Sequence, residues 1–219
     1  YGYQVVGVFS TQAEAEAANL MADNGNYFRG GDMHYVDQNG DHRIDSKDCV
    51  ALGSAAPDFF GGFYTQFKYK GFALGAEFSY SKGNMAYNAV RNQLEGMNTL
   101  GNQSIAVLNR WSLDGQVTDM PRAQHNDPYR STSFSERWLE DASYLRMKSV
   151  TLSYSFDKTV LNFFRSGTLY VSGENLLTAT KYLGLDPEFS YSYSEMSQGL
   201  DYAKMVQPKS VKFGVNLKF

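Results

Sequence analysis

The chain lacks paired cysteines and long apolar runs, which are the features of disulfide-bonded proteins and of helical membrane proteins. Cys49 is its one cysteine among 219 residues, so no disulfide can form within the chain. A small, partly buried apolar side chain is the ordinary role of such a residue. No run of eighteen apolar residues occurs, so no transmembrane helix is predicted. No signal peptide follows Tyr1, and we expect the chain to begin inside a longer one.

The chain also lacks a strong excess of positive or negative charge, and it lacks the sequence motifs of common catalytic sites. The formal net charge is −3, which predicts no nucleic-acid-binding surface. The three histidines form no HExxH pattern, and the sequence contains no GxSxG nucleophile turn. The acid pairs Glu140–Asp141 and Asp186 with Glu188 have the chemistry of glycosidase carboxylates, but nothing in the sequence selects one pair. We therefore predict that the chain is not an enzyme.

Aromatic residues, by contrast, are abundant, with 16 tyrosines and 15 phenylalanines. Tyrosine has a flat apolar ring and a polar hydroxyl, which suits bilayer interfaces and sugar-stacking surfaces. An ordinary aromatic-rich β domain would have the same composition. The negative mean hydropathy of −0.43 does not exclude a membrane protein, because apolar and polar residues alternate in barrel strands.

The last ten residues alternate strictly between polar and apolar side chains. Val211, Phe213, Val215, Leu217 and Phe219 are apolar, and the residues between them are polar or glycine. A strand with this period has one oily and one polar face, as in a half-buried soluble sheet or a membrane barrel. The terminal phenylalanine favours the barrel, because an aromatic ring at the barrel rim lies at the level of the lipid headgroups.

Five segments have strand-like patterns of about the length that spans a bilayer. A strand of ~10 residues, tilted by ~45°, covers ~24 Å, which is the height of a barrel's apolar band. In the third segment the alternation is clean only from Val150 onward. The predicted strands are Gly62–Tyr69, Phe72–Ser81, Tyr144–Phe156, Thr168–Leu177 and Val211–Phe219.

Short and long connections alternate between these strands. Lys70–Gly71 and 157–167 are short, whereas 82–142 and 178–210 are long inserts. Outer-membrane barrels have this asymmetry, with short periplasmic turns and long extracellular loops. Alternatively, the inserts hold helices or a second small domain, and 86–100 is a helix candidate. Five strands cannot close a barrel, so the chain would be part of a larger one.

An acidic loop at 37–48 has the spacing of a calcium-binding loop. Oxygen ligands at positions 1, 3, 5, 7, 9 and 12 surround a hard cation such as Ca²⁺. His42 occupies position 6, where glycine is usual, and the alternative is a solvated turn rich in Asp and Asn. The candidate ligands are Asp37, Asn39, Asp41, the Arg43 carbonyl, Asp45 and Asp48.

The order and spacing of several short motifs resemble the C-terminal part of the SusC-type (RagA-like) TonB-dependent receptors, outer-membrane nutrient importers of Bacteroidetes. No single motif is specific, but together they extend over nearly the whole chain. The motifs are Gly31–Asp37, Leu52–Ser54 with Pro57, Phe60–Phe63, Tyr69–Phe72, Asn109–Trp111, Thr118–Arg122, Ser143–Arg146, Leu152–Tyr154, Gly173–Thr178, Lys181–Glu188 and the terminal Phe219.

This resemblance implies an all-β fold, in which the chain supplies the last five or so antiparallel strands of a transmembrane barrel of about 22 strands. It further implies a plug domain elsewhere in the receptor, a SusD-type surface lipoprotein as lid, and TonB acting through the N-terminal part. The cargo would be a glycan or a peptide, and the location the bacterial outer membrane. The resemblance does not identify the nutrient.

We accordingly predict that residues 1–60 form an extracellular loop region and that 61–219 form the barrel strands with their two inserts. Exposed aromatic rings in the inserts are candidates for contact with a sugar, although each could equally pack the loop or touch the lid protein. These candidates are Trp111, Tyr129, Tyr191 and Tyr193. The alternative function is a soluble extracellular calcium-binding β module for adhesion or carbohydrate binding.

Overall fold

The computed structural model describes residues 1–157, 165–188 and 197–218. The chain divides into two compact units, each made of three chain segments. We call them the loop unit (Tyr1–Ala55, Met85–Glu140 and Ser190–Ala203) and the sheet unit (Ala56–Asn84, Asp141–Phe189 and Lys204–Phe219).

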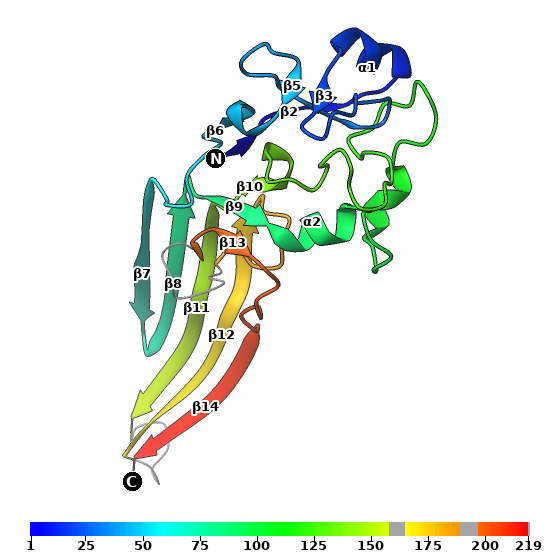
Figure 1. The fold of residues 1–219 in the computed structure, drawn as a ribbon. Helices are drawn as coiled ribbons and strands as arrows, with labels where there is room; N and C mark the ends of the chain where they lie inside the picture. The colour runs from blue at the N-terminus through cyan, green and yellow to red at the C-terminus, as the bar shows by residue number, and fades with distance from the viewer. Residues whose placement is uncertain (158–164, 189–196, 219) are drawn as a thin grey trace. The chain divides into compact units, whose positions relative to one another are not determined.

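The sheet unit contains a five-stranded sheet in the order β14-β12-β11-β8-β7, in which all neighbours are antiparallel (Figure 1). Neighbours in the sheet also follow one another along the chain, apart from short strands of the loop unit. All five predicted strands are confirmed, although Phe219 lies outside the described residues. The strands are β7 (Phe59–Tyr69), β8 (Phe72–Lys82), β11 (Tyr144–Asp157), β12 (Ser166–Thr180) and β14 (Ser210–Lys218).

The predicted hairpin turn at Lys70–Gly71 joins β7 and β8. Both residues have positive φ, 45° for Lys70 and 86° for Gly71. Two successive positive values are typical of the tight turn whose twist matches that of the flanking strands. A Cβ atom at position 71 would also lie 2.7 Å from the backbone oxygen of Ser155, so this strand end requires glycine.

A β-bulge interrupts β11 and explains its irregular alternation. Met147 pairs with Phe78 and Ser149 with Glu77, so Lys148 is an extra residue relative to β8. An inserted residue reverses the parity of the side chains that precede it. Apolar residues on both sides of the bulge therefore lie on the same face of the sheet. This is why the sequence pattern is clean only from Val150 onward.

The loop unit consists of short elements. Among the described residues, no helix is long and apolar enough to cross a membrane. The first segment contains β1 (Gly2–Tyr3), β2 (Val5–Val8), α1 (Gln12–Ala18), β3 (Met21–Ala22), β4 (Met33–Tyr35), β5 (Arg43–Ile44), η1 (Ser46–Asp48) and β6 (Cys49–Val50). The others contain β9 (Met85–Asn88), α2 (Ala89–Glu95), η2 (Ile105–Asn109), η3 (Glu136–Trp138), β10 (Leu139–Asp141), which ends at the unit boundary, and β13 (Leu200–Asp201).

The loop unit has a hydrophobic core of its own. Its central cluster contains Phe9, Phe28 and Tyr35 from the first segment and Tyr129 from the second. Residues of the insert 82–142 thus pack against the N-terminal segment within one compact unit. The helix candidate at 86–100 contains α2. The expected division at residue 60 differs from the observed boundary at Ala55, and the insert 178–210 is shared between the units.

A buried ion pair links the first two segments of the loop unit. Asp32 is 1 % exposed, and the Nε and Nη2 atoms of Arg122 donate to its two oxygens over 2.7 and 3.1 Å. The backbone N–H of Arg29 donates to the same carboxylate over 2.8 Å. Burial raises the pKa of Asp32, and the Arg122 guanidinium offsets part of that rise. This bidentate ion pair holds together Asp32 and Arg122, which are ninety positions apart in the sequence.

We predict that the loop unit loses stability below about pH 6.5, the ordinary pKa of histidine. His34 is half-buried and stacks on the buried ring of Phe9 at a centroid distance of 4.1 Å. Burial lowers the pKa of His34, and the charge of Glu14 only partly opposes this. The neutral imidazole is therefore favoured in the folded state, and its contribution to stability is lost as the pH falls and the unfolded chain takes up a proton.

Hydrogen–deuterium exchange of residues 5–36 in the full-length receptor measures this effect. Exchange at pH 5.5 should be faster, after correction for intrinsic rates, than at pH 7.5. The substitution His34→Phe should remove most of the difference, whereas His125→Phe, at an exposed position, should keep it. Equal pH dependence in both variants would contradict the assignment to His34.

Candidate functional site: a two-faced sheet and an acidic loop

One face of the five-stranded sheet is apolar along its whole length. The strand register places the apolar residues of each strand opposite those of its neighbours. Within the described parts of the chain most of these side chains are exposed, and Phe213 is 81 % and Leu177 66 % exposed. The face includes Phe63, Phe67, Phe72, Leu74, Phe78, Leu145, Met147, Val150, Leu152, Leu169, Val171, Leu177, Val211, Phe213, Val215 and Leu217.

The opposite face is mostly polar, and its side chains contact one another across the strands. The Thr151 hydroxyl lies 2.8 Å from that of Ser172, and the Ser210 hydroxyl donates to Glu174 over 2.9 Å. Lys212 forms an ion pair with the same glutamate. An oily face opposite a hydrogen-bonded polar face is the arrangement of a barrel wall between lipid and an aqueous lumen.

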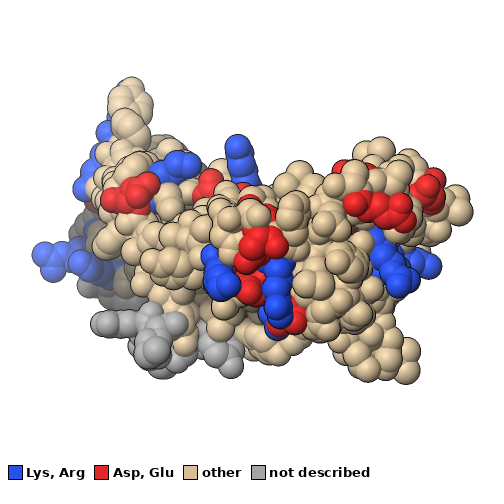
Figure 2. Space-filling model, turned by 45° about the horizontal axis from the view of Figure 1, so that its top comes forward, with Lys and Arg blue, Asp and Glu red and all other residues tan. Residues whose placement is uncertain are grey.

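A charged cluster joins β11 to the segment that follows β12. Arg146, 4 % exposed, pairs with Asp186 and with Glu188, the latter over 3.1 Å, and Lys148 donates to Glu188 over 2.6 Å. The two acids weighed as a glycosidase pair are therefore held by cations. These partners could not be predicted from the sequence, because forty residues separate them and no local motif connects them. Acidic and basic side chains also lie close together on the face drawn in Figure 2.

The acidic loop is held by hydrogen bonds between its side chains and its backbone. The two oxygens of Asp37 accept from the N–H groups of Gly40 and His42, each over 2.8 Å. Although burial alone would raise it, these bonds bring the pKa of Asp37 below its ordinary value. Gly40 and His42 both have positive φ, 75° and 60°. A turn with positive φ is therefore present at position 6 although the residue there is a histidine.

The other candidate ligands also accept or donate within the loop. Asn39 accepts from the N–H of Asp41, which in turn accepts from that of Arg43, each over 2.9 Å. Asp48 is fully buried and accepts from the N–H groups of Gln38 and Asp45 over 2.9 and 2.8 Å. Over the part of the chain that the structure describes, no three His, Cys, Asp or Glu side chains are gathered to hold a metal ion.

Two of the four aromatic candidates pack inside the loop unit. The Trp111 Nε1 donates to the backbone oxygen of Ser10 over 2.9 Å, and its ring lies so close to Gly31 that a Cβ there would be 2.4 Å from it. Tyr129 is 9 % exposed, with its ring 5.7 Å from that of Phe28. Both rings therefore make packing contacts within the loop unit, which is one of the roles that the sequence left open. Tyr191 and Tyr193 lie outside the described residues.

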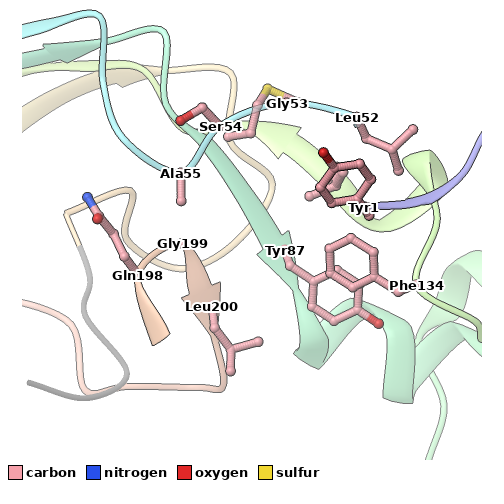
Figure 3. A pocket seen from close by; sticks show the side chains of 12 residues that line it. Tyr1, Leu52, Gly53, Ser54, Ala55, Tyr87, Phe134, Gln198, Gly199 and Leu200 are labelled. Carbon is pink, nitrogen blue, oxygen red and sulfur yellow. The ribbon is translucent and has the colours of Figure 1, made fainter. Parts of the chain in front are cut away.

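The loop unit also contains a pocket of about 340 Å³ that the sequence did not indicate. Figure 3 shows the rings of Tyr87 and Phe134 side by side at one end and Gln198 at the other. The two rings stack at a centroid distance of 4.5 Å. They come from β9 and from a segment forty-seven residues later, so no local pattern could have paired them.

Comparisons with known proteins agree with this architecture. No protein-family model matches the chain. TonB-dependent receptor P3 of Formosa agariphila is 31 % identical over 226 residues, which is 100 % of this chain and 22 % of the receptor. TonB-dependent receptor SusC of Bacteroides thetaiotaomicron is 26 % identical over 188 residues, 84 % of this chain and 17 % of that protein.

Solved structures give the same result. The RagAB peptide importer in its "open-open" state matches with a TM-score of 0.74 and 25 % identity, over 100 % of this chain and 22 % of the solved chain. Its "closed-closed" state matches with a TM-score of 0.68 at 25 % identity over the same shares. This chain thus spans about a fifth of the length of the proteins it resembles.

The two-faced sheet and these matches define part of the wall of an outer-membrane β-barrel. More narrowly, the chain resembles the C-terminal part of the SusC-type (RagA-like) TonB-dependent receptors. It is located in the bacterial outer membrane. The relatives are receptors and importers, which is consistent with the prediction that the chain is not an enzyme.

We predict that Val215→Lys in the full-length receptor strongly reduces the amount of folded protein in the outer membrane. Val215 lies on the apolar face, where a lysine near the bilayer midplane costs about 2–4 kcal/mol. The matched control is Asn216→Lys, one residue on and on the polar face, which should assemble normally. Protease resistance of the receptor in isolated outer membranes measures folding, and equal losses in both variants would contradict the assignment of the faces.

Proposed function

We propose that the receptor containing this chain imports a glycan or peptide nutrient through the outer membrane, driven by TonB and assisted by a SusD-type lipoprotein. The observation that carries this proposal is the sheet with one lipid-facing and one polar face, together with its similarity to nutrient receptors. RagAB is described as a peptide importer, and that description supports the peptide branch of the proposal.

The topology supports an orientation in which both long inserts face the outside of the cell. The connections β8 to β11 and β12 to β14 leave the sheet at one end. The Lys70–Gly71 turn, the end of β11 at Asp157 and the start of β12 at Ser166 lie at the other. Long loops of outer-membrane barrels are extracellular. In the second segment of the loop unit, Ile105, Leu108 and Val117 are 73–89 % exposed, which gives the lipoprotein or the rest of the receptor apolar surface to bury.

The rival function, a water-soluble calcium-binding β module, is disfavoured by the sheet. An uncovered apolar face in water would forgo about 25 cal/mol for every Å² that it leaves exposed. Contiguous exposed patches of this kind mark surfaces that meet lipid or another protein.

Growth and uptake experiments test the proposal. Cells that lack the full-length receptor, or that are depleted of TonB, should lose uptake of one class of nutrient, either fluorescently labelled peptides or labelled glycans. A tagged receptor should retain a surface lipoprotein during purification, and the nutrient class should be the one whose uptake returns on complementation. Unchanged uptake of every peptide and glycan tested after removal of the receptor would contradict the proposal.

We further propose that the acidic loop at 37–48 binds Ca²⁺ weakly. The oxygen-rich spacing and the turn at His42 support this, although Asp41 and Asp45 would have to reorient from their present backbone and lysine contacts. Double substitution to Asp41→Ala and Asp45→Ala should abolish binding to the intact receptor, for which a Kd of ~10⁻⁴–10⁻³ M is expected. Calorimetry measures it, with Asp23→Ala as the control outside the loop. If calorimetry detects no heat of Ca²⁺ binding to the unaltered loop at millimolar calcium, the assignment of this loop as a calcium site is wrong.

A further inference from the structure

At the long-insert end of the sheet, the apolar face finishes in two lysines. Lys82 is the last residue of β8 and pairs with Phe59 on the apolar face, and Lys181 directly follows β12. Both line an open surface pocket of about 470 Å³ that is built entirely from the sheet unit. The pocket therefore lies at the boundary between the oily face and the polar region beyond it.

The floor of this pocket is aromatic. The rings of Phe59 and Tyr80 meet edge to face at a centroid distance of 6.1 Å, and Phe59 is 57 % exposed. In the register, Tyr80 is followed toward the middle of the sheet by Phe78 on β8 and is opposed by Leu145 on β11. The pocket is thus continuous with the apolar face, and aromatic rings at such a position lie at the level of lipid headgroups.

A carboxylate holds the basic side of the pocket in place. The Lys82 Nζ lies 3.7 Å from one oxygen of Asp141, whose other oxygen accepts from the backbone N–H and the hydroxyl of Ser143. The Ser143 hydroxyl, and beyond it the charges of Lys82 and Lys181, lower the pKa of Asp141, so this carboxylate is ionised. Two lysines and one aspartate leave a net positive charge, and the Lys82 side chain is 57 % exposed.

We propose that this rim pocket binds the phosphorylated headgroup of a lipid in the outer leaflet of the membrane. The phosphate contacts Lys82 and Lys181, and the acyl chains lie along the apolar face below Phe59 and Tyr80. A basic pocket beside an apolar surface is the arrangement that recognises anionic lipid headgroups. A soluble phosphate has no acyl chains and would gain nothing from the apolar surface. The assignment to the outer leaflet rests on the orientation given under the proposed function.

The test uses the full-length receptor in detergent, titrated with bisphosphorylated lipid A and followed by native mass spectrometry. The unaltered receptor should bind this lipid more tightly than its dephosphorylated counterpart. The double variant Lys82→Gln, Lys181→Gln should bind it about 20- to 30-fold more weakly, or about 2 kcal/mol, because each lysine near an anionic lipid contributes about 1 kcal/mol. The matched control, Lys68→Gln with Lys212→Gln, removes two lysines of the polar face and should bind like the unaltered receptor.

Three outcomes would overturn the proposal. They are equal affinity for the two forms of lipid A, equal weakening in both double variants, and displacement of the lipid by millimolar inorganic phosphate, which would indicate a site for free phosphate. Nutrient uptake by the Lys82→Gln, Lys181→Gln variant should be normal. A receptor that imports but does not select phosphorylated lipid would therefore disprove only the lipid site, and one that binds the lipid without importing would disprove only the import function.

Discussion

The pairing of backbone groups across five antiparallel strands is the constraint on which the sheet unit depends. In hydrocarbon no water is available to an unpaired N–H or C=O, so each strand must lie between two neighbours. The inner strands β8, β11 and β12 have both neighbours in this chain. The edges β7 and β14 each lack a second partner among the described strands, and the remaining strands of the barrel must supply it. Lipid on one side and a lumen on the other then dictate which side chains each face carries.

This constraint also explains how much of the fold the sequence could predict. Strand positions followed from the alternation, because two different solvents act on successive side chains. The bulge at Lys148 could not be inferred, since an extra residue is recognised only against its neighbouring strand. The fold of the loop unit could not be predicted for a related reason. The contacts of Asp32 with Arg122 and of Phe28 with Tyr129 join positions about a hundred residues apart, and no local sequence pattern indicates them.

For the candidate sites, residue types were easier to predict than the directions of side chains. The acidic loop turns with positive φ at Gly40 and His42, yet Asp48 is buried and accepts hydrogen bonds from the backbone. Tyr129 was expected in an exposed insert and instead lies in a core. In both cases the composition of the segment indicated which residue types were present. The burial of the Asp48 and Tyr129 side chains depends on contacts with the rest of the loop unit.

The small sheet β10-β9-β13 has a consequence for assembly of the barrel wall. Pairing β8 with β11 requires closure of a connection of about sixty residues, and the entropy cost of closure rises with its length. Because β9 and β10 are neighbours in one sheet, the start and the finish of that connection are held together, and β13 adds the return of the second insert. If the loop unit folds before the wall assembles, it holds the ends of both long connections close together, and the entropy cost of pairing the strands on either side falls toward that of a short hairpin.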